Sequence, residues 1–304
     1  MKQRQALDAR AASIMFVLCI FWGLQQVVLK IAAPDISPLM QMALRSGISA
    51  LLVWPLIRLA QGVHLWTPTY LYPGLLVGLL FAAEFFMLAE AIRFTSASHT
   101  VVLLYTAPIF VALGLHWKLP SERLSLLQWS GILLAFLGIV VTFLGRDSQL
   151  SAATSSMLYG DFLALCAGIL WAATTIAVRL TPLAEAPATQ TLFYQLLGGF
   201  IVLFPLAYWS GQAVVHWSPV AIGSLLFHAI LISFASYLIW FWLLKNYLAS
   251  RLGVFSFLTP LFGVLFGVWL LGEQLEHSFI MGAILVMLGV VMVSAQGWFK
   301  RRVA

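Results

Sequence analysis

The sequence predicts an all-α membrane protein that crosses the bilayer ten times, as two inverted five-helix repeats. Two observations predict this fold. Of the 304 residues, 62% are hydrophobic and only 9% are charged, and so apolar a chain cannot hide its side chains in one soluble core. In addition, the pattern of residues 103–141 returns at residues 255–291. The chain therefore consists of two similar halves.

The internal repeat is defined by a proline, a glutamate and two glycines. Each copy has an apolar helix with the proline, a polar break with the glutamate, and a second apolar helix with the glycines. The equivalent pairs are Pro108 and Pro260, Glu122 and Glu273, Gly131 and Gly282, and Gly138 and Gly289, at steps of 151 or 152 positions. Upstream, Trp22 matches Trp171 at a step of 149. We expect one repeat in residues 1–148 and the second in 149–304, together forming one unit.

The apolar runs give the ten expected spans. Each is roughly 20 residues long, enough for an α-helix to cross the hydrocarbon core, and none shows the alternation of a membrane barrel. The spans are residues 13–32, 38–60, 70–92, 97–117, 126–145, 157–178, 189–209, 218–244, 250–271 and 277–297. Because five spans per repeat is an odd number, consecutive repeats must have opposite orientations, as they do in many secondary transporters.

The basic residues predict the orientation. With a cytoplasmic N-terminus, only Lys30, Arg93 and Arg146 lie outside, and Arg45 lies within a span. The inside segments hold Lys2, Arg4, Arg10, Arg58, Lys118, Arg123, Arg179, Lys245, Arg251, Lys300, Arg301 and Arg302. This bias predicts a multi-pass protein of a bacterial-type inner membrane with both termini in the cytoplasm. It also explains the net charge of +6, so the lipid bilayer is the expected partner and nucleic acid is not.

Polar residues follow a tryptophan on the first span of each repeat. At helical spacing these residues share a face with the tryptophan. We interpret both faces as walls of a central substrate site; the alternative is that the polar side chains bond neighbouring helices, at about 1 kcal/mol each. The residues are Trp22, Gln25 and Gln26 in the first span and Trp171, Thr174 and Thr175 in the sixth.

Ionisable and aromatic residues within other spans extend the candidate site. Glu84 lies near the middle of the third span, where a carboxylate costs a few kcal/mol unless it faces a wet cavity, a partner or a proton. It is either a site for a proton or a substrate amine, or a structural carboxylate bonded to a neighbouring helix. Arg45 either pairs with an acid or extends to the surface. Tyr105, Tyr237 and Trp240 are further candidates, with an interfacial belt as the alternative for the last two.

The prolines, loop acids, histidines and cysteines complete the candidates. Pro108 and Pro260 free helix carbonyls and act either as hinges or as static kinks. Glu122 and Glu273 are expected to cap helices or fix loops, and His99 is expected at the interface. Because both cysteines lie in apolar stretches, we expect no disulfide and no metal site. No cofactor is expected either.

The sequence resembles the drug/metabolite transporter superfamily, and within it the EamA-type exporters. The resemblance lies in the ten spans, in the tryptophan in the first helix of each half, and in the Pro, Glu and Gly pattern that ends each half. The run AIRFTSASHTVVLLYTAPIFVAL at 91–113, followed by LPSERLS at 119–125, is most similar to bacterial aromatic amino acid exporters. The resemblance implies an alternating-access exporter with a central cavity formed by both halves.

We therefore expect a secondary transporter that exports small metabolites, foremost amino acids with an aromatic or bulky apolar side chain. A drug-like cation, a nucleoside or an organic acid is the alternative cargo, and an intramembrane enzyme is the alternative class. The chain has no Gly-rich stretch that ends in Gly-Lys-Ser/Thr, no Gly-x-Ser-x-Gly and no His-Glu-x-x-His, which disfavours both ATP drive and an enzyme. The oligomeric state stays open, and a monomer is compatible with the sequence.

Overall fold

The computed structural model describes residues 8–59, 63–118, 124–144, 152–247, 256 and 258–294. Within these ranges the regular elements are helices, and an isolated antiparallel bridge joins Ile36 to Val215. The helices are α1 Ala9–Ala32, α2 Pro38–Leu59, α3 Pro68–Phe94, α4 Ala97–Leu104, α5 Ala107–Lys118, α6 Leu126–Leu144, α7 Ala152–Leu180, η2 Pro182–Ala184, α8 Ala188–Trp209, α9 Pro219–Leu226, η3 Phe227–Ser236, α10 Tyr237–Asn246, α12 Leu258–Leu271 and α13 His277–Ser294.

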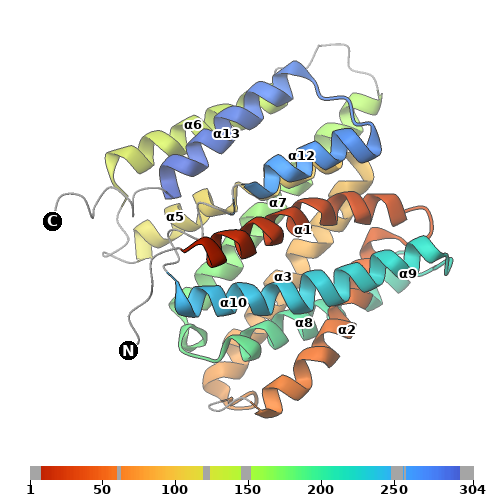
Figure 1. Cartoon of the computed structure of the whole chain (residues 1–304), viewed down its shortest axis with the longest axis vertical. Helices are drawn as coiled ribbons and strands as arrows, with labels where there is room; N and C mark the ends of the chain where they lie inside the picture. Colours follow the sequence, from red (N-terminus) through yellow and green to blue (C-terminus); the bar gives the residue numbers. More distant parts are fainter. Residues whose placement is uncertain are drawn as a thin grey trace.

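The predicted all-helical membrane class is confirmed. Seven helical stretches of the described residues are long and apolar enough to cross a membrane, and they fall on seven of the predicted spans. The shorter apolar helices α6, α12 and α13 fall on the other three. Helix α1 begins and α13 ends at the same end of the bundle (Figure 1). The opposite end carries Lys30 and is called the Lys30 end below.

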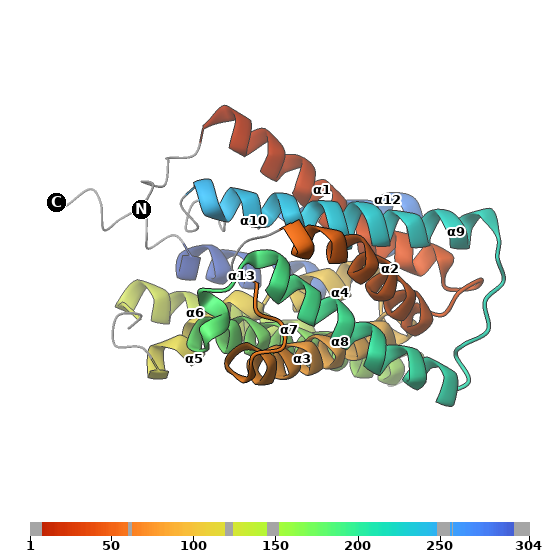
Figure 2. The same cartoon turned by 90° about the horizontal axis from the view of Figure 1, so that it is seen from below.

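The helices form a ring in two layers. Following the contacts around the ring, each of these elements touches the next: α3, α7, α4, α12, α1, η3, α2, α8 and again α3. Figure 2 shows α1, α2, α9 and α10 in one layer and α3, α7 and α8 in the other. The antiparallel pair α6 and α13 lies outside the ring along one edge (Figure 1) and contacts it through α13 and α5.

Two of the long stretches are irregular inside. Between α4 and α5 the helix is broken at Tyr105 and Thr106, because Pro108 has no N–H for the carbonyl four residues earlier. The Thr106 hydroxyl donates to the carbonyl of Leu103 at 2.6 Å. Between α9 and α10, residues 227–236 of η3 form a π-helix, which the sequence analysis did not predict. Such wide turns inside a helix frequently occur at functional sites.

The four repeat glycines bring α6 and α13 into close contact, as their spacing predicts. A Cβ at Gly131 would lie 2.7 Å from the carbonyl oxygen of Gly289, and one at Gly138 would lie 2.6 Å from that of Gly282. The earlier glycine of one helix thus meets the later glycine of the other, so the two helices run antiparallel. Small residues allow this approach of two backbones.

Gly138→Ala should destabilise the protein by about 1–3 kcal/mol, because the added methyl meets the backbone of α13 and cannot be relieved by a side-chain rotation. The measurement is the apparent Tm of the detergent-purified protein. Gly223→Ala in α9 is the matched control, since a Cβ there meets nothing within 4 Å; it should keep or raise the Tm, because alanine favours helix. Equal Tm values for the two variants would contradict the packing role of Gly138.

Candidate functional site

Four polar residues interact inside the ring and form the central cluster: Arg45 of α2, Glu84 of α3, Tyr105 at the break after α4, and Tyr237 at the start of α10. The side chains of Arg45 and Glu84 are 0% and 6% exposed. The charges of Arg45 and Glu84 interact with each other and with Tyr237, and Glu84 also interacts with Tyr105. Both halves of the sequence therefore contribute to one buried site, and the inward placement predicted for Glu84 agrees with it.

Arg45 does not extend to the surface, so that alternative is wrong. Its guanidinium carbon lies 4.3 Å from the centre of the Phe85 ring, a cation–π distance. Its three side-chain nitrogens are buried, and none has a hydrogen-bond partner among the described residues. Glu84 attracts Arg45 electrostatically, yet the two form no direct ion pair in the described part of the chain. The guanidinium is thus buried with its donors free.

Other buried polar atoms on the ring helices also lack a protein partner within the described ranges. Both amide atoms of Gln41, which lies one helical turn before Arg45, have none. The same holds for Oε1 of Gln26 and Oγ of Ser233. Because buried polar groups are almost always hydrogen-bonded in native proteins, these atoms require water or a bound molecule. The ring interior is therefore suited to a polar guest.

The predicted aromatic residues form two separate pairs. The rings of Trp22 and Trp240 meet edge to face at 5.6 Å, and those of Tyr105 and Trp171 do so at 5.2 Å. The Trp22 indole N–H donates to the Ser236 hydroxyl at 2.9 Å, which ties α1 to η3. Tyr105 brings its pair to the central cluster, whereas Trp22 belongs to the apolar packing between α1 and α10.

The predicted polar residues of α1 and α7 are distributed over different surroundings. The Gln25 carbonyl lies 3.0 Å from Nε2 of His228, so this residue links α1 to η3 through its backbone. Thr174 is buried and Thr175 is exposed. Each threonine hydroxyl donates to a carbonyl of its own helix, Leu170 or Trp171, at 3.0 Å. Thr175 therefore does not lie with the central cluster in this conformation.

The predicted hinge prolines differ in position. Pro108 lies in the first turn of α5, directly after the break at Tyr105 and Thr106. Pro260 lies in α12, which shows no break over Leu258–Leu271, and the described residue Ser256 before it is also helical. Among the described residues, Pro108 therefore lies next to a break in a long helical stretch, whereas Pro260 does not.

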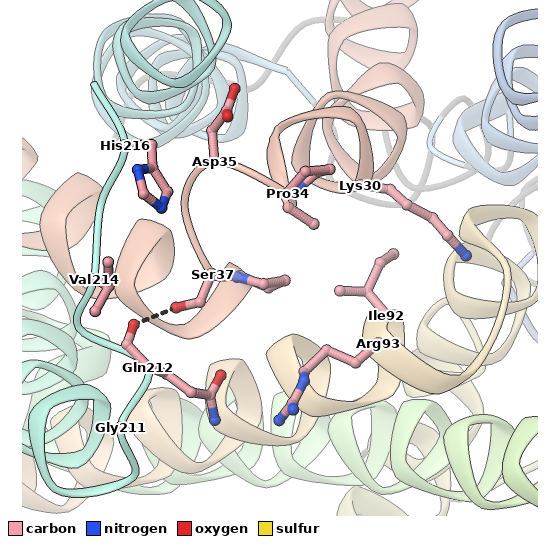
Figure 3. A pocket seen from close by; sticks show the side chains of 12 residues that line it. Lys30, Pro34, Asp35, Ser37, Ile92, Arg93, Gly211, Gln212, Val214 and His216 are labelled. Carbon is pink, nitrogen blue, oxygen red and sulfur yellow. Dashed lines mark hydrogen bonds between the residues drawn. The ribbon is translucent and has the colours of Figure 1, made fainter. Parts of the chain in front are cut away.

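Two pockets open at the Lys30 end. The larger, of about 600 Å³, is lined by Lys30 and Arg93 on one side and His216 and Val214 on the other (Figure 3). The smaller, of about 390 Å³, shares Lys30 and Arg93 and includes Glu273. Two of the three basic residues predicted outside the membrane therefore line the pockets at this end, and each is paired with an acid: Lys30 with Glu273 at 3.9 Å and Arg93 with Glu90 at 2.6 Å.

Glu273 joins the two halves at the Lys30 end. Its carboxylate accepts from the backbone N–H groups of Ala97 at 2.6 Å and Ser98 at 3.0 Å, and from the Ser98 hydroxyl at 2.6 Å. Lys30 Nζ lies 3.9 Å from it. The predicted capping role is confirmed, but the capped helix is α4 of the other half, where the helix dipole favours a negative charge. Glu122 lies outside the described residues.

A second buried contact between the halves was missed by the sequence analysis. His99 lies at the start of α4, near a helix end as expected, but it is 0% exposed. Its Nδ1 lies 3.0 Å from Oδ2 of Asp161, and Oδ1 of Asp161 accepts from the Thr95 hydroxyl at 2.5 Å. Asp161 is the only acidic residue in the predicted span 157–178, which is the signal that should have identified it.

Comparison with known proteins assigns the family. The EamA-like transporter family matches the chain twice, over residues 9–144 and 158–295. The uncharacterized transporter YoaV of Bacillus subtilis is 25% identical over 90% of this chain and 92% of its own length. A probable amino-acid metabolite efflux pump of Escherichia coli is 28% identical over 94% of this chain and 96% of its own.

A solved structure shares the fold. One crystal structure of a protein superimposes with a TM-score of 0.64 at 19% identity, covering 93% of this chain and 97% of the other. With the double family match and the transporter relatives, the helical bundle and its buried polar cluster lead to one assignment. The chain belongs to the EamA-like transporter family, within the drug/metabolite transporter superfamily.

Proposed function

We propose that this transporter exports amino acids with an aromatic or bulky apolar side chain across a bacterial-type inner membrane by alternating access. The observation that carries the proposal is the central cluster, a buried polar site to which both halves contribute inside an apolar ring. Polar groups within a membrane protein generally mark a substrate or ion pathway. Two relatives named as probable amino-acid metabolite efflux pumps, from Salmonella typhimurium and Escherichia coli, support the cargo class.

The proposal includes ten spans in two inverted repeats, residues 1–148 and 149–304. Helices α6 and α13 are equivalent in the sequence repeat, at a step of 151, and they run antiparallel through equivalent glycines. Equivalent helices that cross antiparallel are what a two-fold axis in the membrane plane produces. The helix contacts have the same symmetry. Helix α1 touches α12 of the other repeat, and its equivalent α7 touches α4 and α5, which are the equivalents of α12.

The cargo's side chain contacts the aromatic pair beside the cluster. Tyr105 and Trp171 present ring edges and faces, which hold an apolar group through surface burial and about 0.5–1.5 kcal/mol of aromatic contact. Weak holding is suited to an exporter, because the cargo must also leave. The break at Tyr105 and Thr106 and the π segment η3 provide the irregular backbone at which the spans bend.

The Glu273 and Asp161 contacts close the Lys30 end. Each acid lies in the second half and bonds groups at the α3–α4 connection of the first half. An outward opening must therefore break these bonds, and the pockets lined by Lys30 and Arg93 become the exit.

The topology is tested with fused reporters. A periplasm-specific alkaline phosphatase inserted after residue 148 should be active, and one fused after Ala304 should be inactive, because the basic residues place both termini in the cytoplasm. A fluorescent protein that folds only in the cytoplasm serves as the converse reporter at the same two positions. The reverse pattern would contradict the orientation.

Transport is tested by counterflow of radiolabelled L-phenylalanine in proteoliposomes. Trp171→Ala should lower the apparent affinity by about 2- to 10-fold, the factor that corresponds to about 0.5–1.5 kcal/mol, and Trp171→Phe should lower it less. Trp269→Ala is the matched control, because Trp269 is 74% exposed on α12 and faces away from the ring interior. Equal effects at positions 171 and 269 would show that the Tyr105 and Trp171 pair does not contact the cargo.

A further inference from the structure

Arg45 presents unused hydrogen-bond donors to the ring interior. The side chain is 0% exposed, and Nε and both terminal nitrogens lack a partner among the described residues. A guanidinium donates five N–H groups in a planar fork that matches a carboxylate in two parallel hydrogen bonds. The face of Phe85 covers the plane of the fork but uses none of its in-plane donors. The unmet requirement is therefore for an anion with oxygen acceptors.

Gln41 extends this donor surface. It lies four residues before Arg45 on α2, so the two side chains share one helical face. Gln41 is also 0% exposed, and both its amide oxygen and its amide nitrogen lack a partner in the described ranges. The amide N–H groups supply further donors beside the guanidinium, and the amide oxygen supplies an acceptor. Arg45 and Gln41, one turn apart on the same helix, thus both have hydrogen-bond donors without a protein partner.

Glu84 supplies the opposite charge across the cluster. It lies on α3, which contacts α2, and it attracts Arg45 without forming a direct ion pair. Among the described residues its carboxylate accepts no hydrogen bond from the protein, and only 6% of the residue is exposed. A carboxylate in these surroundings requires a cationic partner or a proton.

A zwitterion meets both requirements at once. A cargo with only an amine leaves the Arg45 guanidinium without an anion, and a cargo with only a carboxylate leaves Glu84 without a cation. An α-amino acid carries both groups on one carbon and adds no net charge to the buried site, and its two charged groups need partners there to offset their desolvation. The separated Arg45 and Glu84 charges are therefore complementary to a zwitterion.

We propose that Arg45, with Gln41 beside it, binds the α-carboxylate of the cargo and that Glu84 binds its α-ammonium group. This inference rests on the proposed export of amino acids and names the atoms that select them. The aromatic pair at Tyr105 and Trp171 then contacts the side chain, while the two charged residues hold the part common to all amino acids. Arg45 and Glu84 thereby determine the cargo class.

The test uses two competitors that each lack one charged group. Wild-type protein in proteoliposomes carries out counterflow of radiolabelled L-phenylalanine, and unlabelled L-phenylalanine, phenethylamine and 3-phenylpropionate compete. Phenethylamine lacks the carboxylate and 3-phenylpropionate lacks the ammonium group, with the ring unchanged. Each should compete at least about tenfold more weakly than L-phenylalanine, because a buried charged partner is left unmatched. Equal competition by all three compounds would overturn the inference.

The variants assign each group to its residue. In Arg45→Gln, phenethylamine should compete almost as well as L-phenylalanine, while 3-phenylpropionate should still compete more weakly. In Glu84→Gln, 3-phenylpropionate should compete almost as well as L-phenylalanine, while phenethylamine should still compete more weakly. Arg58→Gln, an exposed arginine of the same helix that stacks on Trp54, is the matched control and should keep both differences. A variant that lowers competition by all three compounds to the same extent would show that the substituted residue has only a structural role.

The outcomes separate this inference from the export proposal. Counterflow of L-phenylalanine without discrimination between the competitors would retain amino acid transport and overturn the roles of Arg45 and Glu84. Absence of counterflow for a whole panel of zwitterionic amino acids would overturn both proposals. If Arg45→Gln and Glu84→Gln do not yield monodisperse protein, the competition series with wild-type protein decides, because it requires no substitution.

Discussion

A buried guanidinium without a direct counter-ion is the constraint on which this structure depends. Within the described part of this apolar bundle, the cost of burying Arg45 is lowered by the Phe85 ring and by electrostatic interaction with Tyr237 and Glu84. Replacing such a group by a well-packed hydrophobic residue would generally not destabilise a protein. We propose that recognition of a charged cargo accounts for its presence inside the ring.

The surrounding fold encloses this site with both closely packed and irregular segments. The α6 and α13 pair is fixed by backbone contact at four glycines, and it lies outside the ring (Figure 1). The ring itself has a break at Tyr105 and a π segment in η3, beside the residues that interact with Glu84. The two halves are joined at the Lys30 end by a few hydrogen bonds between polar groups. Such bonds are either made or broken, which is compatible with a switch between two conformations.

Much of the architecture follows from local patterns in the sequence. The cost of a carboxylate in lipid placed Glu84 inward, and the glycine spacing predicted the α6 and α13 contact. Tertiary contacts were beyond such patterns, including the cap that Glu273 gives to α4 and the pairing of His99 with Asp161. Thr174 and Thr175 show a limit of face assignment, since neighbouring helical residues differ by about 100° and only the first is buried.

The central claim is that the cluster is alternately open to the two sides of the membrane. Its most direct test is thiol labelling of Gln41→Cys in a background with Cys19→Ala and Cys166→Ala, using an impermeant reagent on oriented vesicles. Position 41 should react from either side, and L-phenylalanine should change the rate. Ala43→Cys, equally buried on the same helix, should stay unreactive because it belongs to the packed core. If position 41 resists labelling from both sides, the ring interior is a closed core and the account is contradicted.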